Sequence, residues 1–158
     1  MKKITVLLFV ITLLLSGCTR DSEFKVGEQM SKINNKNTPY ITMNALSVYK
    51  DTNNYLVIID DNDIIQKLVE FSPDRKSIRV QGLDLIKCED INHFLDMDID
   101  ELGKKYGQPH VDIGSGFYIP AYITDDAYLI CLGLEDDIVF EVIKRDLLTN
   151  EIVDCVNN

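Results

Sequence analysis

Three short apolar segments in the last third of the chain, separated by acidic turns, constrain its fold most strongly. The segments are residues 117–123, 127–134 and 138–144. Residues 125–126 and 135–137 separate them and are all Asp or Glu. Short apolar runs between such turns are typical of strands joined as hairpins. The pattern therefore predicts an antiparallel three-strand meander.

The turn lengths predict the register of this meander. A two-residue turn at 125–126 pairs Ile123 with Tyr128. The same register gives three further pairs: Ala121 with Ile130, Ile119 with Leu132, and Phe117 with Leu134. A three-residue loop at 135–137 continues that face with Ile138, Phe140 and Val142. Because side chains alternate between the two faces of a strand, we expect these residues to form one core-facing surface.

The opposite face of the meander is also apolar, with Glu141 as its one charge. It carries Tyr118, Pro120, Tyr122, Leu129, Cys131, Val139 and Ile143. A sheet face in contact with water should alternate to polar residues, and this one does not. We expect the first half of the chain to cover Leu129, Cys131 and Ile143, which lie toward the middle strand.

Tyr118 and Tyr122 are the two members of this face that we expect to be exposed. They lie at its edge, beside a glycine-containing loop at 114–116. Tyrosine combines a broad apolar ring with a polar tip and is enriched at protein interfaces. We therefore predict that Tyr118 and Tyr122 bind a protein partner, whose identity the sequence does not give.

A short helix is predicted just before the meander. Asp98, with Glu101 three residues later, matches a capping box. Gly107 provides a C-terminal stop, and Pro109 follows it. These start and stop signals predict a helix of about two turns over 99–106.

The middle of the chain predicts further strands. Residues 55–59 are an apolar, β-branched run, and residues 60–63 have a turn composition. Residues 64–71 fit either a strand or one face of a helix; we favour a strand, because a turn after a β-rich run favours a hairpin. Residues 77–86 alternate like a strand, whereas residues 40–49 fit a short helix and a strand equally well.

These segments predict an α+β fold with a small antiparallel sheet and one or two short helices. Residues 39–158 suit a single domain. Residues 55–69 resemble residues 128–143, and this weak repeat leaves open two related halves, 39–86 and 87–158.

The N-terminus has the parts of a secretory signal. Lys2 and Lys3 precede an apolar run over 4–15, which as a helix would span about 18 Å, short of the roughly 30 Å of a bilayer core. The segment Leu-Ser-Gly-Cys that ends at Cys18 resembles the lipobox of bacterial lipoproteins. The resemblance implies that residues 1–17 are a signal peptide and that Cys18 becomes the lipidated N-terminus. Two acyl chains would then anchor the chain stably at the outer face of the cell membrane, or of the outer membrane in a diderm cell.

The mature chain is predicted to be acidic and tethered. The whole chain has a net charge of −10, and losing Lys2 and Lys3 with the signal peptide makes it about −12. Such a surface repels nucleic acid, so we expect no nucleic-acid partner. Residues 18–38 are polar and without pattern, which favours a flexible tether between the lipid and the domain.

No catalytic, cofactor or metal site is predicted. The alternating aspartates around Asp98 are not followed by glycine and glutamate at the positions where a calcium loop requires them. The spacing of His93 and His110 does not match that of metal ligands. Besides Cys18, three cysteines allow at most one internal disulfide, and a bridge between Cys88 and Cys155 is one such pairing. A small hydrolase or metal-dependent enzyme with a dispersed site remains an alternative, as does a ligand-binding lipoprotein of a transporter.

The segment MDIDELGKKYGQP, a glycine-containing loop and the meander together resemble a known unit. Small bacterial lipoproteins of the outer-membrane assembly type (the SmpA/OmlA domain) have a short helix, a Gly-x-Pro turn and antiparallel strands. The β-lactamase-inhibitor protein fold repeats a similar unit twice. The matching residues are Met97, Leu102, Tyr106, Gly107, Pro109 and Tyr122. The resemblance implies a noncatalytic scaffold that binds or inhibits another protein.

Overall fold

The computed structural model describes residues 24–34, 38–50, 53–87 and 90–158, which form an α+β fold dominated by sheet. Sheet 1 contains β1 (Ile41–Met43), β2 (Leu46–Lys50), β3 (Tyr55–Asp61), β4 (Ile64–Phe71) and β5 (Ile78–Gln81). Sheet 2 contains β6 (Val111–Asp112), β7 (Pro120–Ile123), β8 (Tyr128–Glu135), β9 (Ile138–Asp146) and β10 (Ile152–Asn157). The helices are α2 (Ser31–Asn34), the 3-10 helix η1 (Ile91–Phe94) and α3 (Ile99–Tyr106). The predicted α+β class is confirmed, with more sheet than expected.

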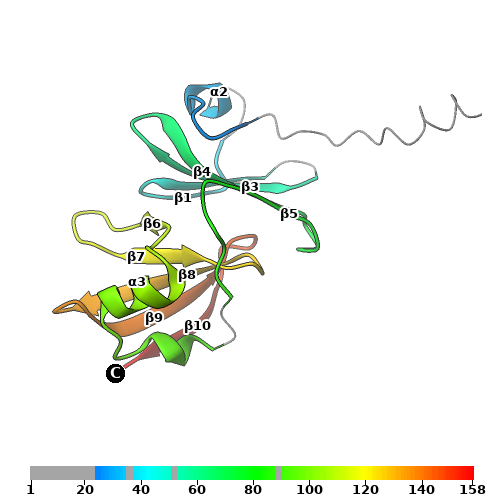
Figure 1. Cartoon of the computed structure of the whole chain (residues 1–158). Coiled ribbons are helices and arrows are strands. Elements are labelled where there is room, and N and C mark those ends of the chain that lie inside the picture. Colours follow the sequence, from blue (N-terminus) through cyan, green and yellow to red (C-terminus); the bar gives the residue numbers. More distant parts are fainter. Residues whose placement is uncertain (1–23, 35–37, 51–52, 88–89) are drawn as a thin grey trace, which may run out of the picture.

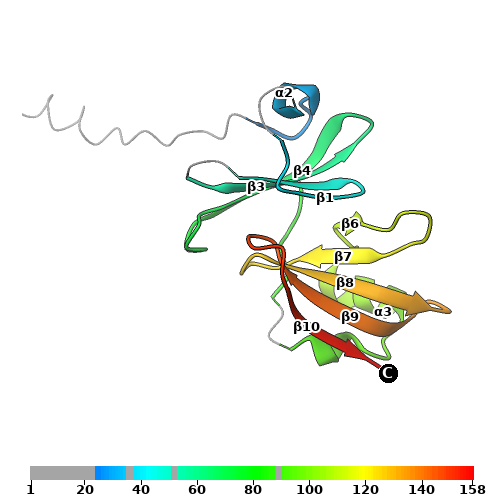
Figure 2. The ribbon, with the colours of Figure 1, turned by 180° about the vertical axis from the view of Figure 1, so that it is seen from behind.

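The fold has four layers, which Figures 1 and 2 show from opposite sides. The inner faces of the two sheets pack together, and Val57 and Leu129 are buried between them. The outer face of sheet 1 packs against the segment around α2, which buries Ile33. The outer face of sheet 2 packs against η1 and α3, which bury Phe94 and Leu102. Both faces of each sheet are therefore covered over much of their area, which explains why neither face alternates to polar residues.

The two segments that fit both helix and strand are resolved as strands. Residues 64–71 form β4, which is antiparallel to β3 and confirms the favoured interpretation. Residues 40–49 contain β1 and β2, a hairpin with Asn44 at a positive φ of 44° in its turn. Asparagine tolerates this backbone conformation better than most residues, which explains its place in the turn. The residue type alone does not predict the turn, because the turn depends on the pairing of the two strands.

Helix α3 begins and ends where its sequence signals predict. The Asp98 carboxylate accepts hydrogen bonds from the backbone N–H groups of Asp100 and Glu101, at 2.8 and 3.3 Å. Gly107 ends the helix with a φ of 83°, a conformation that favours glycine. Leu102 is fully buried and holds the helix against sheet 2.

The predicted register of β7 and β8 is wrong by one residue. Ala121 pairs with Cys131, and Ile123 pairs with Leu129. The reason is Ala127, which has a φ of 66° and belongs to a three-residue loop after Thr124 instead of to the strand. A one-residue shift exchanges the faces of one strand relative to its neighbour.

The turn between β8 and β9 is one residue shorter than predicted. Glu135 pairs with Ile138 across a two-residue turn, in which Asp136 and Asp137 both have positive φ. A bulge at Phe140 then restores the alternation, because Gly133 pairs with Glu141. Phe140 leaves the ladder at this point and is 39% exposed, so its predicted place in the core is wrong.

Other core assignments have mixed outcomes. Phe117 is 70% exposed, because β7 begins only at Pro120 and Phe117 lies in the preceding loop. The expected cover of the second face is confirmed for Leu129 and Cys131, which are buried between the two sheets. Ile143 packs at the edge of the same cluster.

The tether prediction is wrong for residues 24–34. Met30 and Ile33 are buried, and this segment hydrogen-bonds to β4: Gly27 N–H donates to the carbonyl of Ile65 at 2.9 Å. Two apolar residues in a polar stretch suffice, because β4 supplies backbone partners to this segment and the outer face of sheet 1 supplies an apolar surface. The remaining residues of the tether, and Cys18, lie outside the described residues, as does Cys88 of the Cys88–Cys155 pairing.

The two halves of the fold share a backbone plan, with corresponding hairpin residues 74 positions apart and the residues before the helices 69 positions apart. In each half a two-residue turn, at 62–63 and 136–137, is followed by a bulge on the second strand. In each half the segment before the helix hydrogen-bonds to that second strand in the same pattern: Met30 N–H to Asp63, and Ile99 N–H to Asp137. The correspondence covers the hairpin and the segment that leads into the helix.

Candidate functional site

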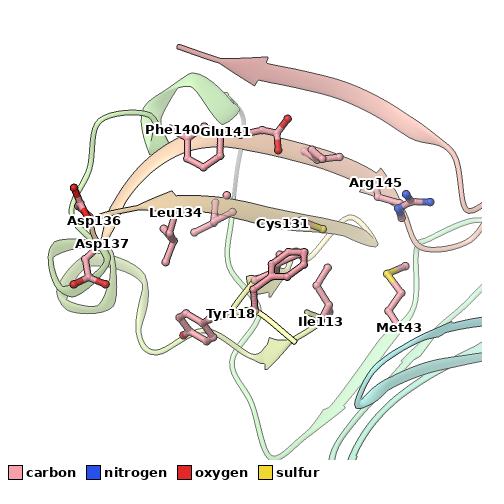
Figure 3. Close-up of a pocket in the computed structure, with 15 residues that line it drawn as sticks. Met43, Ile113, Tyr118, Cys131, Leu134, Asp136, Asp137, Phe140, Glu141 and Arg145 are labelled. Carbon is pink, nitrogen blue, oxygen red and sulfur yellow. The ribbon is translucent and has the colours of Figure 1, made fainter. Parts of the chain in front are cut away.

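A groove of about 670 Å³ lies on the inner face of sheet 2, along the hairpin of β8 and β9. Figure 3 shows the two strands as its floor, with Asp136 and Asp137 at one end and Arg145 at the other. Met43 is the one residue of sheet 1 that lines it. Sheet 1 therefore covers only part of this face, and the remainder is open.

The loop between β6 and β7 forms one wall of the groove. The Asp112 carboxylate holds this loop by accepting hydrogen bonds from the N–H groups of Gly114 and Ile119, at 2.9 and 3.0 Å. A side chain at Gly114 would meet the carbonyl oxygen of Phe117 at 1.7 Å, so this close turn requires glycine. The loop is thereby fixed with Phe117 and Tyr118 at the groove.

Aromatic residues form the exposed part of the lining. Phe117, Tyr118 and Phe140 are 70%, 53% and 39% exposed. Phe140 lies over Gly133, since a side chain there would come within 3.2 Å of the Phe140 ring. Large exposed aromatic residues gathered in one concave site are uncommon on soluble domains and mark surfaces that bind something.

The groove is polarised by charge. Asp136 and Asp137 stand at the β8–β9 turn, and Glu141 lines the groove further along β9, where it pairs with Gly133. In the described part of the chain, no ion pair includes any of these three carboxylates. At the far end, the Arg145 guanidinium donates to the carbonyl and side-chain oxygens of Asn150, both at 2.9 Å.

Two groups at the floor and wall stay uncharged near neutral pH. Burial raises the pKa of the Cys131 thiol to about 11, so the side chain is a neutral thiol in the groove. Burial and the nearby Asp112 also raise the pKa of Tyr118. Neither group is activated as a nucleophile or base, and the groove is suited to binding.

The structure separates the two tyrosines predicted as binding residues. Tyr118 is exposed in the groove, as expected. Tyr122 is fully buried, so the prediction that it is exposed and binds a partner is wrong. The register shift turns Tyr122 toward α3, where its hydroxyl donates to the carbonyl of Gly107 at 2.9 Å. Its ring packs edge-on against His110, and burial raises its pKa to about 12.

Sequence reasoning missed Phe117 and Phe140 as groove residues. Both had been assigned to the core by alternation, which assumes an unbroken strand. The loop at 114–116 was a signal that β7 starts late, because closely spaced glycines favour turns over strands. The bulge that exposes Phe140 has no comparable signal in the sequence.

A second polar cluster lies at the junction of the sheets. His110 Nδ1 accepts a hydrogen bond from the N–H of Ile123 at 2.8 Å, and Lys67 donates to the His110 carbonyl. Burial, with Lys67 nearby, lowers the pKa of His110 to about 4, so the imidazole is neutral. Burial also lowers the pKa of Lys67. Because His110 is buried and used by the backbone, this cluster joins the sheets and offers no catalytic base to a substrate.

Among the described residues, no group of three His, Cys, Asp or Glu side chains is placed to hold a metal ion. The described helices are also too short and too polar for any of them to cross a bilayer. Comparisons of the chain with protein-family models, curated proteins and solved structures gave no match.

Proposed function

We propose that this protein is a lipid-anchored surface lipoprotein whose domain binds another protein through the groove on sheet 2. The observation that carries the proposal is the exposed aromatic lining formed by Phe117, Tyr118 and Phe140. Exposed aromatic rings around a concave apolar surface are the usual anchors of protein interfaces. The neutral state of Cys131 and the use of His110 by the backbone support binding over catalysis.

The proposed anchor is consistent with how the domain begins. Only six positions separate Cys18 from Phe24, the first described residue, and six extended residues reach about 20 Å. Because residues 24–34 pack on sheet 1, the α2 end of the domain would stay close to the membrane. In Figure 1 sheet 2 lies on the side away from α2, which would leave the groove accessible from outside.

The resemblance to SmpA/OmlA-type and β-lactamase-inhibitor-type domains is part of this proposal. The repeated hairpin-and-helix plan supports two related halves, and the consecutive strand order of sheet 2 supports the meander. We propose that the halves arose by duplication of one such unit. The proposal includes a noncatalytic role at the outer face of the cell membrane.

Photo-crosslinking in membranes tests the proposed function. Benzoylphenylalanine placed at the position of Tyr118 should give a discrete protein adduct in cells, and Cys18→Ser should release the protein from the membrane. Benzoylphenylalanine at Ile152, which is 55% exposed on β10 and outside the groove, is the matched control. Equal labelling from both positions would reject the groove as the binding surface. Palmitate labelling of Cys18→Ser at the wild-type level would reject the anchor.

A further inference from the structure

The groove occupies the part of sheet 2 where its side chains differ from those of sheet 1. Sheet 1 buries Ile59 and Phe71 between the sheets. The corresponding positions of sheet 2 are Gly133 and Arg145, which line the groove. The ring of Phe140 lies over Gly133 and is 39% exposed, so this part of the face presents an aromatic surface to an occupant of the groove.

The shape of the groove suits an extended chain. It follows β9 from Asp137 to Arg145, eight positions apart, which corresponds to about 26 Å at the rise of a strand. The same length accommodates about eight residues of extended peptide. The apolar lining lies between the charged ends, where Phe117 and Phe140 face the solvent.

The charges select the chemistry of the occupant. Asp136 and Asp137 at the turn, and Glu141 further along β9, have no cationic partner within the described residues, while the Arg145 guanidinium at the other end donates to Asn150. An incoming cation at the turn would therefore gain interactions, and an anion there would be repelled. The net charge of the chain, −10, adds long-range attraction for a basic partner.

We propose that the groove takes an extended segment of a partner protein, with apolar side chains over the aromatic lining and a lysine or arginine over the β8–β9 turn. This inference rests on the proposed function and names the chemistry of its partner. The apolar side chains of that segment pack against Phe117 and Phe140. Its basic group lies beside Asp136 and Asp137.

Tryptophan-labelled peptides test this proposal directly, because the chain has 0 Trp and contributes no tryptophan fluorescence of its own. The full-length lipidated protein is reconstituted in phosphatidylcholine vesicles, with empty vesicles as the blank. One peptide carries two lysines before leucine, tryptophan, valine and leucine; the other carries two glutamates instead. We expect a blue shift on binding, with the lysine peptide bound about tenfold more tightly than the glutamate peptide.

Two charge-neutralising double variants identify the site. Asp136→Asn with Asp137→Asn keeps a residue suited to positive φ at both turn positions and should reduce the lysine preference to about twofold. Asp61→Asn with Asp63→Asn removes two charges at the corresponding turn of sheet 1, which lines no part of the groove, and should leave the preference unchanged. Circular dichroism checks that both variants are folded.

Several results would overturn the proposed chemistry. Equal affinity for both peptides would do so, as would an equal effect of the two double variants. If oleate displaced the lysine peptide at a concentration below that of the peptide, the occupant would be a lipid. If the protein self-associated and thereby lost peptide binding, the occupant would be a second copy of this chain. If neither peptide bound but the crosslink at the Tyr118 position still formed, the basic segment would be rejected and the proposed function retained.

Discussion

Sheet 1 and sheet 2 each contain a hairpin with a two-residue turn and a bulge on its second strand, yet they bury their surfaces differently. The helix-facing residues correspond: Ile58 and Leu132 are both fully buried, as are Ile65 and Val139. On the inner face the two sheets diverge, because sheet 1 has Ile59 where sheet 2 has Gly133. The helices diverge too, with four residues in α2 and eight in α3.

This difference separates the sheet residues that both halves keep large and apolar from those that differ between the halves. The residues that face a helix stay large and apolar in both halves, because each sheet needs its outer cover. Away from the β8–β9 turn, the sheets are joined by the buried cluster that includes Val57 and Leu129 and by the ion pair of Arg75 with Asp146. The region of sheet 2 near that turn is therefore available for binding.

The largest expected effect tests whether the two helices are equivalent anchors. Ile33→Ala and Leu102→Ala each remove a fully buried side chain between a helix and its sheet. Each should lower the free energy of unfolding by about 2 to 5 kcal/mol, measured by urea denaturation. An unchanged midpoint for Ile33→Ala would mean that residues 24–34 are a tether after all and that the halves are not equivalent.

The next effect concerns the junction between the halves and is pH-dependent. The folded pKa of His110 is about 4, below the ordinary value of 6.5, so the unfolded state binds this proton first as the pH falls. Stability from His110 is complete above about pH 6.5 and is lost between pH 6.5 and pH 4, by up to about 3 kcal/mol. His110→Gln should flatten that part of the stability curve relative to wild type. Parallel curves for the two proteins would place the loss on carboxylates alone.

A smaller effect on stability distinguishes the N-terminus of α3 from the segment before α2. Asp98→Ala should cost about 0.5 to 2 kcal/mol, because two backbone N–H groups lose their acceptor. Gln29, at the corresponding bridge in the first half, has no such capping role, so Gln29→Ala should cost less than about 0.5 kcal/mol. Thermal unfolding of both variants compares them, and equal losses would contradict the capping assignment.

The smallest effect sharpens the similarity of the two turns. Asp63 and Asp137 are the second residues of two-residue turns and have φ values of 63° and 65°. Glycine is preferred at this position, so Asp63→Gly and Asp137→Gly should each stabilise by about 0.5 kcal/mol. Midpoints from denaturant titration should rise by similar amounts. A gain in one variant only would show that the two turns are held differently by their surroundings.

The sequence predicted those elements whose signals are local. Helix α3 has its cap at Asp98 and its stop at Gly107, which lie next to the residues they affect. Strand β4 was favoured because a turn precedes it. The residues of the groove were predicted less well: Tyr118 was placed at an exposed edge, whereas Tyr122 was assigned to the same surface and is buried.

The sequence alone determined that this chain would be α+β, with apolar strands, acidic turns and one well-capped helix, because composition and spacing act over a few residues. Only the tertiary structure decided which faces are covered. The positive φ of Ala127 and the bulge at Phe140 each shift a strand by one residue, and such a shift exchanges core and surface without changing any local preference. The groove depends on these shifts and on the limited reach of sheet 1, which are set by packing between segments far apart in the chain.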